Sequence, residues 1–80
     1  MPVVLTIGPY KFFFYSNEGA PRKAPHIHVR GGGGEAKLSL APPCEVLENV
    51  GYSAADLRTI RNLVYDNREM LAGAYHEYFS

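Results

Sequence analysis

The chain has little cysteine and no excess of charge. Its 80 residues include one cysteine, Cys44, which excludes an internal disulfide and favours a reducing, cytoplasmic compartment. We expect Cys44 to be a small apolar residue at a strand edge rather than a nucleophile. Eight basic and eight acidic side chains leave a formal net charge of zero. This balance argues against avid, nonspecific nucleic-acid binding, because such binding depends on neutralising many phosphates.

The sequence also lacks a long apolar run. No segment approaches the length of a membrane span, and Met1–Leu5 lacks the basic flank of a signal peptide, so we expect no membrane partner. The hydrophobic fraction of 46% is nevertheless too high for a disordered chain. We therefore expect a single domain over residues 1–80. Because so small a domain is marginally stable alone, we also expect a homodimer or a small cognate partner protein.

Charge is unevenly divided between the two halves of the chain. Residues 1–40 carry five basic and two acidic side chains, and residues 41–80 carry three basic and six acidic ones, so their formal charges are +3 and −3. This asymmetry favours a local site for RNA or another anionic ligand, or a head-to-tail contact between copies.

The best-specified segment is a pair of alternating stretches linked by glycines. Pro25–Arg30 and Glu35–Leu40 both alternate polar and apolar residues, and four glycines separate them. This pattern predicts two antiparallel strands joined by a turn.

The register of this hairpin separates a polar face from an apolar one. Successive side chains on a strand point to opposite faces, so one cross-strand pair fixes the others. The polar face is expected to carry the pairs Arg30 with Glu35, His28 with Lys37, and His26 with Ser39. The apolar face is expected to carry Ile27 with Leu38, and Val29 with Ala36.

Three shorter segments add to the expected sheet. Val3–Ile7 and Tyr10–Ser16 flank a Gly-Pro turn and predict a hairpin, and Cys44–Leu47 predicts a short edge strand. The fold class that we expect is α+β, with a curved antiparallel sheet of about four strands in residues 1–47.

One long amphipathic helix is expected over residues 53–79, packed on one face of the sheet. Ser53 followed by Asp56 is typical of a helix start, and apolar side chains then recur at steps of three or four residues. Gly73 lowers helix stability by about 1 kcal/mol relative to alanine, so we expect a bend near it.

His26 and His28 are candidate metal ligands. Two histidines two residues apart on a strand project side by side and can share a divalent ion such as zinc. Glu18 or His76 would supply a third ligand. A metal-bound water could then hydrolyse a substrate.

A metal-free alternative uses the same face as a basic site for a phosphate or a carboxylate. His26, His28 and Lys37 are then the candidate catalytic residues, with one histidine as a base. The candidate binding residues are Arg22, Lys23, Arg30, Tyr15 and Glu18. A third interpretation is structural, because histidines often hydrogen-bond to loop backbone and stabilise a sheet face.

Four segments together resemble a bacterial family, the domain of unknown function 4160. They are Tyr10–Glu18, Pro25–Val29, Ala36–Lys37 and His76–Phe79. The resemblance covers nearly the whole chain. It implies a small stand-alone prokaryotic protein encoded beside another small protein, in the manner of toxin–antitoxin cassettes, with no reaction established.

The resemblance and the histidine face together lead to two functional hypotheses. The first is a component of a toxin–antitoxin-type gene pair that acts through a partner protein or a homodimer, with an exposed His-x-His surface as its working site. The alternative is a hydrolase, either ribonuclease-like or metal-assisted, that uses His26 and His28.

Overall fold

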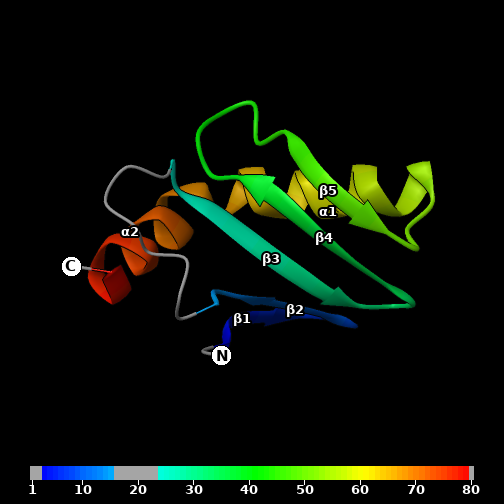
Figure 1. The fold of residues 1–80 in the computed structure, drawn as a ribbon, viewed down its shortest axis with the longest axis horizontal. Helices are drawn as coiled ribbons and strands as arrows, with labels where there is room; N and C mark the ends of the chain where they lie inside the picture. Colours follow the sequence, from blue (N-terminus) through cyan, green and yellow to red (C-terminus); the bar gives the residue numbers. More distant parts are fainter. Residues whose placement is uncertain (1–2, 16–23, 80) are drawn as a thin grey trace.

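The protein is described by a computed structural model that covers residues 3–15 and 24–79. Its elements in chain order are the strands β1 (Val3–Ile7), β2 (Tyr10–Phe13), β3 (His26–Gly31), β4 (Gly34–Ser39) and β5 (Val46–Val50), and the helices α1 (Ala54–Asp66) and α2 (Arg68–Phe79). The strands form one open antiparallel sheet in the order β1-β2-β3-β4-β5 (Figure 1).

The expected α+β class is confirmed, with five strands instead of about four. β5 begins at Val46 and extends to Val50, whereas the short edge strand expected from the sequence covered Cys44–Leu47. The backbone departs from an extended strand at Gly51, with φ of 92°, which explains why β5 ends at Val50.

The C-terminal segment forms two helices instead of one, and the interruption lies at Asn67. Gly73, where a bend was expected, lies inside α2. The Asn67 side-chain amide donates a hydrogen bond to the Leu63 carbonyl at 2.8 Å, and its backbone leaves the helical region with φ of −108° and ψ of 16°. Asparagine side chains compete with the backbone for helix carbonyls, which explains why the first helix ends here.

The start of α1 is a capping box, as the sequence predicts. The Asp56 backbone N–H donates to the Ser53 hydroxyl at 3.1 Å, and the Ser53 backbone N–H donates to the Asp56 carboxylate at 3.4 Å. Two amides that a helix start leaves unpaired are thereby satisfied, which fixes where α1 begins beneath the sheet.

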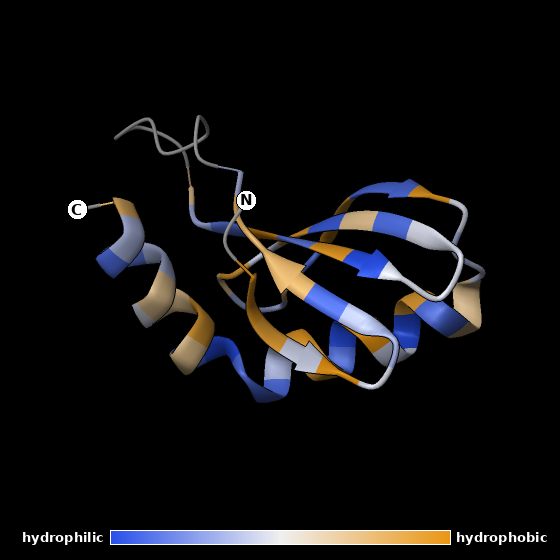
Figure 2. Ribbon diagram, turned by 90° about the horizontal axis from the view of Figure 1, so that it is seen from below, coloured by the Kyte–Doolittle hydropathy of each residue, from blue (hydrophilic) through white to orange (hydrophobic). Residues whose placement is uncertain are grey.

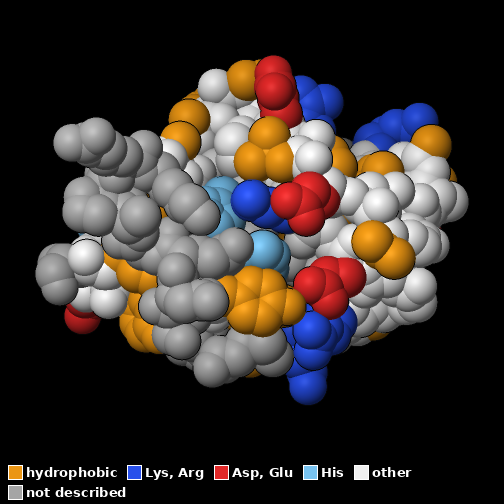
Figure 3. All heavy atoms as spheres, viewed as in Figure 1, with side chains coloured by type: hydrophobic (Ala, Val, Ile, Leu, Met, Phe, Trp, Pro, Cys, Tyr) orange, Lys and Arg blue, Asp and Glu red, His pale blue; other side chains and the backbone are white. Residues whose placement is uncertain are grey.

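The core lies between the sheet and the two helices, which form a second layer (Figure 2). Side chains that are fully buried or nearly so come from both layers and include Phe12, Ile27, Val29, Leu38, Ile60, Val64 and Leu71. The strand register places His26, His28, Arg30, Glu35 and Lys37 on the opposite face of the sheet. Neither α1 nor α2 lies over this face (Figure 1). Histidine, basic and acidic side chains gather on it (Figure 3). We call it the open face.

Candidate functional site

The open face is built around the predicted hairpin, and the predicted register is confirmed. β3 and β4 pair His26 with Ser39, His28 with Lys37 and Arg30 with Glu35. The imidazole rings of His26 and His28 lie side by side, with centroids 5.4 Å apart and planes at 80°. The sequence therefore brings both histidines to one face, as expected.

Both histidines are buried, which corrects the expectation of an exposed histidine surface. His26 is 5% exposed and His28 is 6% exposed. The Phe13 ring stacks on His28 at 5.6 Å, and the Tyr15 ring meets His28 edge-on at 4.5 Å. Phe13 belongs to β2 and Tyr15 lies just after it, so aromatic rings from this part of the chain enclose His28. The His26 ring instead lies beside the Tyr75 ring of α2, with centroids 6.0 Å apart.

The His26 ring is held by the backbone that leads into β3. Its Nδ1 lies 3.1 Å from the Ala24 carbonyl oxygen, which can only accept, so Nδ1 carries the hydrogen. No buried side-chain nitrogen or oxygen of the described residues lacks a hydrogen-bond partner. This satisfied arrangement agrees with the structural interpretation of the histidines.

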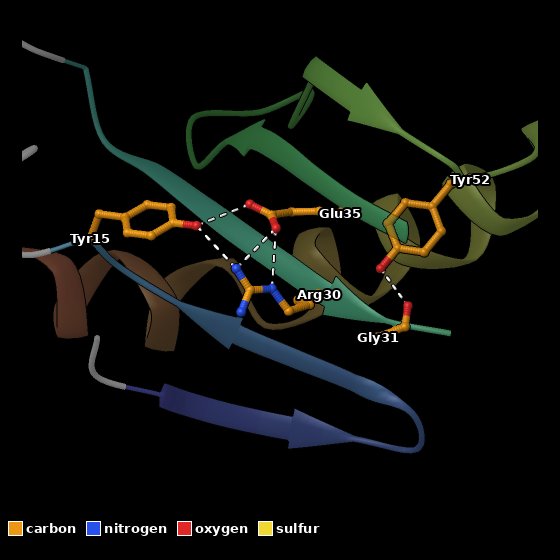
Figure 4. Close-up of polar contacts among 5 residues, drawn as sticks. All are labelled: Tyr15, Arg30, Gly31, Glu35 and Tyr52. Atoms are coloured by element: carbon orange, nitrogen blue, oxygen red, sulfur yellow. Dashed lines mark hydrogen bonds and ion pairs between the residues drawn. The ribbon is translucent and has the colours of Figure 1, made fainter. Parts of the chain in front are cut away.

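A network of three residues borders the histidines on the side of the turn (Figure 4). The Arg30 Nε donates to Glu35 at 3.1 Å, the Tyr15 hydroxyl donates to Glu35 at 3.1 Å, and Arg30 also donates to the Tyr15 hydroxyl at 3.3 Å. The Arg30 guanidinium also lies 5.4 Å from the centre of the Phe13 ring. The charge of Arg30 is thus already compensated by a neighbouring carboxylate.

The same network changes how Tyr15 and Arg30 titrate. Burial raises the pKa of the Tyr15 hydroxyl, and the adjacent Glu35 carboxylate raises it further, while Arg30 opposes the shift. Glu35 also raises the pKa of Arg30. At neutral pH the hydroxyl therefore stays a hydrogen-bond donor and the guanidinium stays charged.

Lys37 occupies the middle of the open face. Its ammonium lies 3.5 Å from the Glu48 carboxylate on β5, and the side chains of Lys37 and Glu48 are 23% and 70% exposed. A depression of about 390 Å³ beside it is lined by Tyr15, His28, Glu35, Ala36, Lys37, Glu48 and Val50. A second depression of about 220 Å³ is lined by Ala24, Pro25, His26, Lys37, Ser39 and Leu47. Lys37 therefore contributes to both, and each depression has one of the two histidines in its wall.

Several predicted site residues are not brought to this face or lie outside the described residues. Arg22, Lys23 and Glu18 belong to residues 16–23, which the structure does not describe. His76 lies near the end of α2, where its ring contacts Tyr75 at 5.9 Å.

His76 is not grouped with His26 and His28 in the part of the chain that the structure describes. In residues 3–15 and 24–79, no three histidine, cysteine, aspartate or glutamate side chains are grouped closely enough to hold a metal ion. The pair His26 and His28 thus has no third ligand from the described part of the chain.

Glu48 and Val50 are residues of the site that were not predicted from the sequence. Both lie on the part of β5 beyond Leu47, where the expected edge strand ended. The two β-branched residues Val46 and Val50 before Gly51 were the signal for a longer strand, because β-branched residues favour strands and glycine ends them.

The protein is a small α+β domain with an open antiparallel sheet, two helices on one face and a buried histidine pair at the centre of the other. The model of the family described as Domain of unknown function (DUF4160) matches residues 10–76, so the chain belongs to that family. No curated protein and no solved structure matches it. None of the helices formed by the described residues combines the length and the apolar character needed to cross a bilayer.

Proposed function

We propose that this protein is a small cytoplasmic binding protein, one component of a toxin–antitoxin-type gene pair, and that its open face contacts the cognate partner protein. The observation that carries the proposal is the state of the histidine pair. Both histidine residues are about 95% buried; His28 contacts the rings of Phe13 and Tyr15, and His26 lies beside the ring of Tyr75 on α2. A fixed and satisfied centre of this kind supports a docking surface better than a reactive cleft.

The residues around the histidine pair have the chemistry of a protein interface. Tyrosine and arginine are enriched at interface centres, and Tyr15 and Arg30 are already fixed by Glu35. Their rotamers therefore lose little entropy on binding. Lys37 at the centre is paired with Glu48, and Arg30 is paired with Glu35, whereas an avid polyanion site requires several uncompensated cations.

The test is complex formation with the product of the adjacent gene, measured by size-exclusion chromatography with light scattering and by calorimetric titration. We expect Lys37→Glu to weaken the complex about tenfold or more, because it replaces a largely buried cation at the centre of the face. Arg58→Glu, the same charge change at an exposed position of α1, is the control and should bind normally. Absence of a complex, or equal binding by both variants, would contradict the proposal.

The alternative function is hydrolysis by His26 and His28, and the specific observation that favours it is the 5.4 Å separation of their rings. An expression assay separates the two. If the wild-type protein slows growth and the arrest survives His26→Ala and His28→Ala, the histidines are not catalytic. If metal analysis finds zinc bound and chelation lowers the melting temperature, the metal-assisted alternative replaces the binding proposal.

A further inference from the structure

The outer edge of β5 is an unpaired strand edge beside the open face. Among the described residues β5 pairs only with β4, and it ends the sheet (Figure 1). Four of its five residues are exposed, with Leu47 at 49% and Val50 at 73%. Proteins commonly protect such edges with lysine, proline or a β-bulge. β5 contains neither lysine nor proline, and the irregularity in its pairing with β4 lies at Leu47, so the segment from Glu48 to Val50 is regularly paired. The edge is therefore available to another strand.

Two rows of side chains cross the open face and end at this edge. The first row consists of Phe13, His28, Lys37 and Glu48. The second row consists of Lys11, Arg30, Glu35 and Val50. In the first row the positive charge of Lys37 is followed by the negative charge of Glu48. A residue of an added strand that continued this row would lie opposite Glu48, whose side chain is 70% exposed. A residue of an added strand that continued the second row would lie opposite Val50, which is exposed.

We infer that β5 receives an extended strand of the partner protein in which a basic residue and an apolar residue stand two positions apart. The inference rests on the proposed function and adds the chemistry of the partner. Because side chains alternate along a strand, the residues opposite Glu48 and Val50 share the open face whichever way the added strand runs. The basic residue pairs with Glu48, and the apolar residue covers Val50.

The depression on the open face continues from this edge toward the histidines. Glu48 and Val50 belong to its wall at β5, and Tyr15 and His28 belong to its wall at β2 and β3. With a volume of about 390 Å³ it has room for side chains that lean inward from an added strand. The strand edge and the open face are thus one continuous surface.

A second copy of this chain fits the edge poorly. β5 contains no basic residue, so no register of two paired β5 strands places a cation opposite Glu48, and antiparallel pairing centred on Glu48 places two carboxylates directly opposite each other. The other edge strand, β1, has no charged residue and cannot supply a cation opposite Glu48. Charge complementarity therefore favours a strand from a different protein.

The test is a nuclear magnetic resonance titration of the full-length protein with capped synthetic peptides. The probe has Arg and Val two positions apart in an otherwise all-Thr sequence, and a second peptide has Glu in place of Arg. We expect the Arg peptide to shift and protect backbone amides of β5 and β4, and to bind at least about fivefold more tightly than the Glu peptide. A peptide N-methylated along the edge that faces β5 should not bind, because it cannot donate to the strand.

Two protein variants complete the test. Glu48→Gln should remove most of the preference for the Arg peptide, whereas Thr6→Lys, with the same change of net charge on an exposed residue of β1, should retain it. Absence of β5 shifts at millimolar peptide, or equal binding of the Arg and Glu peptides, overturns the inference. Concentration-dependent broadening of β5 amides without peptide overturns it in favour of a second copy. If Lys37→Glu weakens binding of the adjacent gene product but Glu48→Gln and Val50→Thr do not, the inference fails while the proposed function stands.

Discussion

The Tyr52 hydroxyl donates a hydrogen bond to the Gly31 carbonyl and so joins the segment before α1 to the end of β3 (Figure 4). Tyr52 is 6% exposed, and its ring also meets Tyr10 edge-on at 6.1 Å. Its own backbone N–H donates to the Asn49 side chain at 3.1 Å. One side chain therefore connects the two hairpin ends of the sheet with the start of the helical layer.

Tyr52→Phe should lower the free energy of unfolding by about 1–2 kcal/mol, because the partly buried Gly31 carbonyl loses its donor while the ring packing is kept. Urea denaturation followed by circular dichroism measures the change. Tyr65→Phe, at an exposed position of α1, is the control and should change stability by less than about 0.5 kcal/mol. Equal stabilities of the two variants would show that the Tyr52 hydroxyl contributes nothing.

Gly34 lies where the turn of the central hairpin passes Tyr52, and alanine there should destabilise the fold. An added Cβ would lie 2.7 Å from the Val50 carbonyl oxygen and 2.8 Å from the Tyr52 ring, so Gly34→Ala should cost about 2 kcal/mol or more. Gly73→Ala is the matched substitution, because nothing lies within 4 Å of its added Cβ inside α2. It should stabilise the protein by about 0.5–1 kcal/mol. Thermal and urea unfolding should therefore show changes of opposite sign, and a shared sign would contradict the packing described here.

Stability should fall as the pH rises through 10, the ordinary pKa of a tyrosine. Burial raises the pKa of Tyr15 and of Tyr52, with Glu35 contributing in both cases. A pKa that is higher in the folded state than in the unfolded state means that the folded state holds its proton more tightly, so the stabilisation is present below pH 10 and is lost above it.

Unfolding free energies of the wild type and of Tyr15→Phe on either side of pH 10 test this linkage. The variant should lose less stability with rising pH, and the double variant with Tyr52→Phe should lose least. An unchanged pH profile in Tyr15→Phe would mean that Tyr15 titrates as it does in the unfolded chain.

Cys44 should react slowly with thiol reagents in the native protein. Its side chain is fully buried, and burial raises the pKa of its thiol, although Arg68 and Arg61 oppose the shift. Burial of the side chain and the raised pKa of its thiol both reduce the amount of accessible thiolate. Spectrophotometric titration with a disulfide reagent should give slow labelling in buffer and rapid labelling of one thiol in denaturing urea. Rapid labelling of the native protein would place Cys44 at the surface.

The strand register of the central hairpin was predictable because the period of two and the glycine turn leave one arrangement that separates apolar from polar side chains. The helix start at Ser53 was predictable for a similarly local reason, the reciprocal hydrogen bonds of a capping box. The helix break at Asn67 could also have been predicted locally, because an Asp-Asn pair is unfavourable inside a helix. The bend was expected near Gly73 instead, but Gly73 lies inside α2.

The character of the candidate site was not predictable in the same way. Tyr15 and Glu35 are 20 residues apart in sequence and meet only because β2, β3 and β4 are neighbours in the sheet. The contacts of Phe13 and Tyr15 with His28 depend on the neighbouring positions of β2 and β3 in the same sheet.

The sequence by itself determined the α+β class and which side chains share a face of the central hairpin, because alternation and capping act between residues that are close along the chain. The tertiary structure alone decided that His26 and His28 are buried, that the charges of Arg30 and Lys37 are compensated, and that β5 ends the sheet with an open edge. Burial and charge compensation depend on side chains from other strands, whose distances are fixed only when the whole sheet has formed.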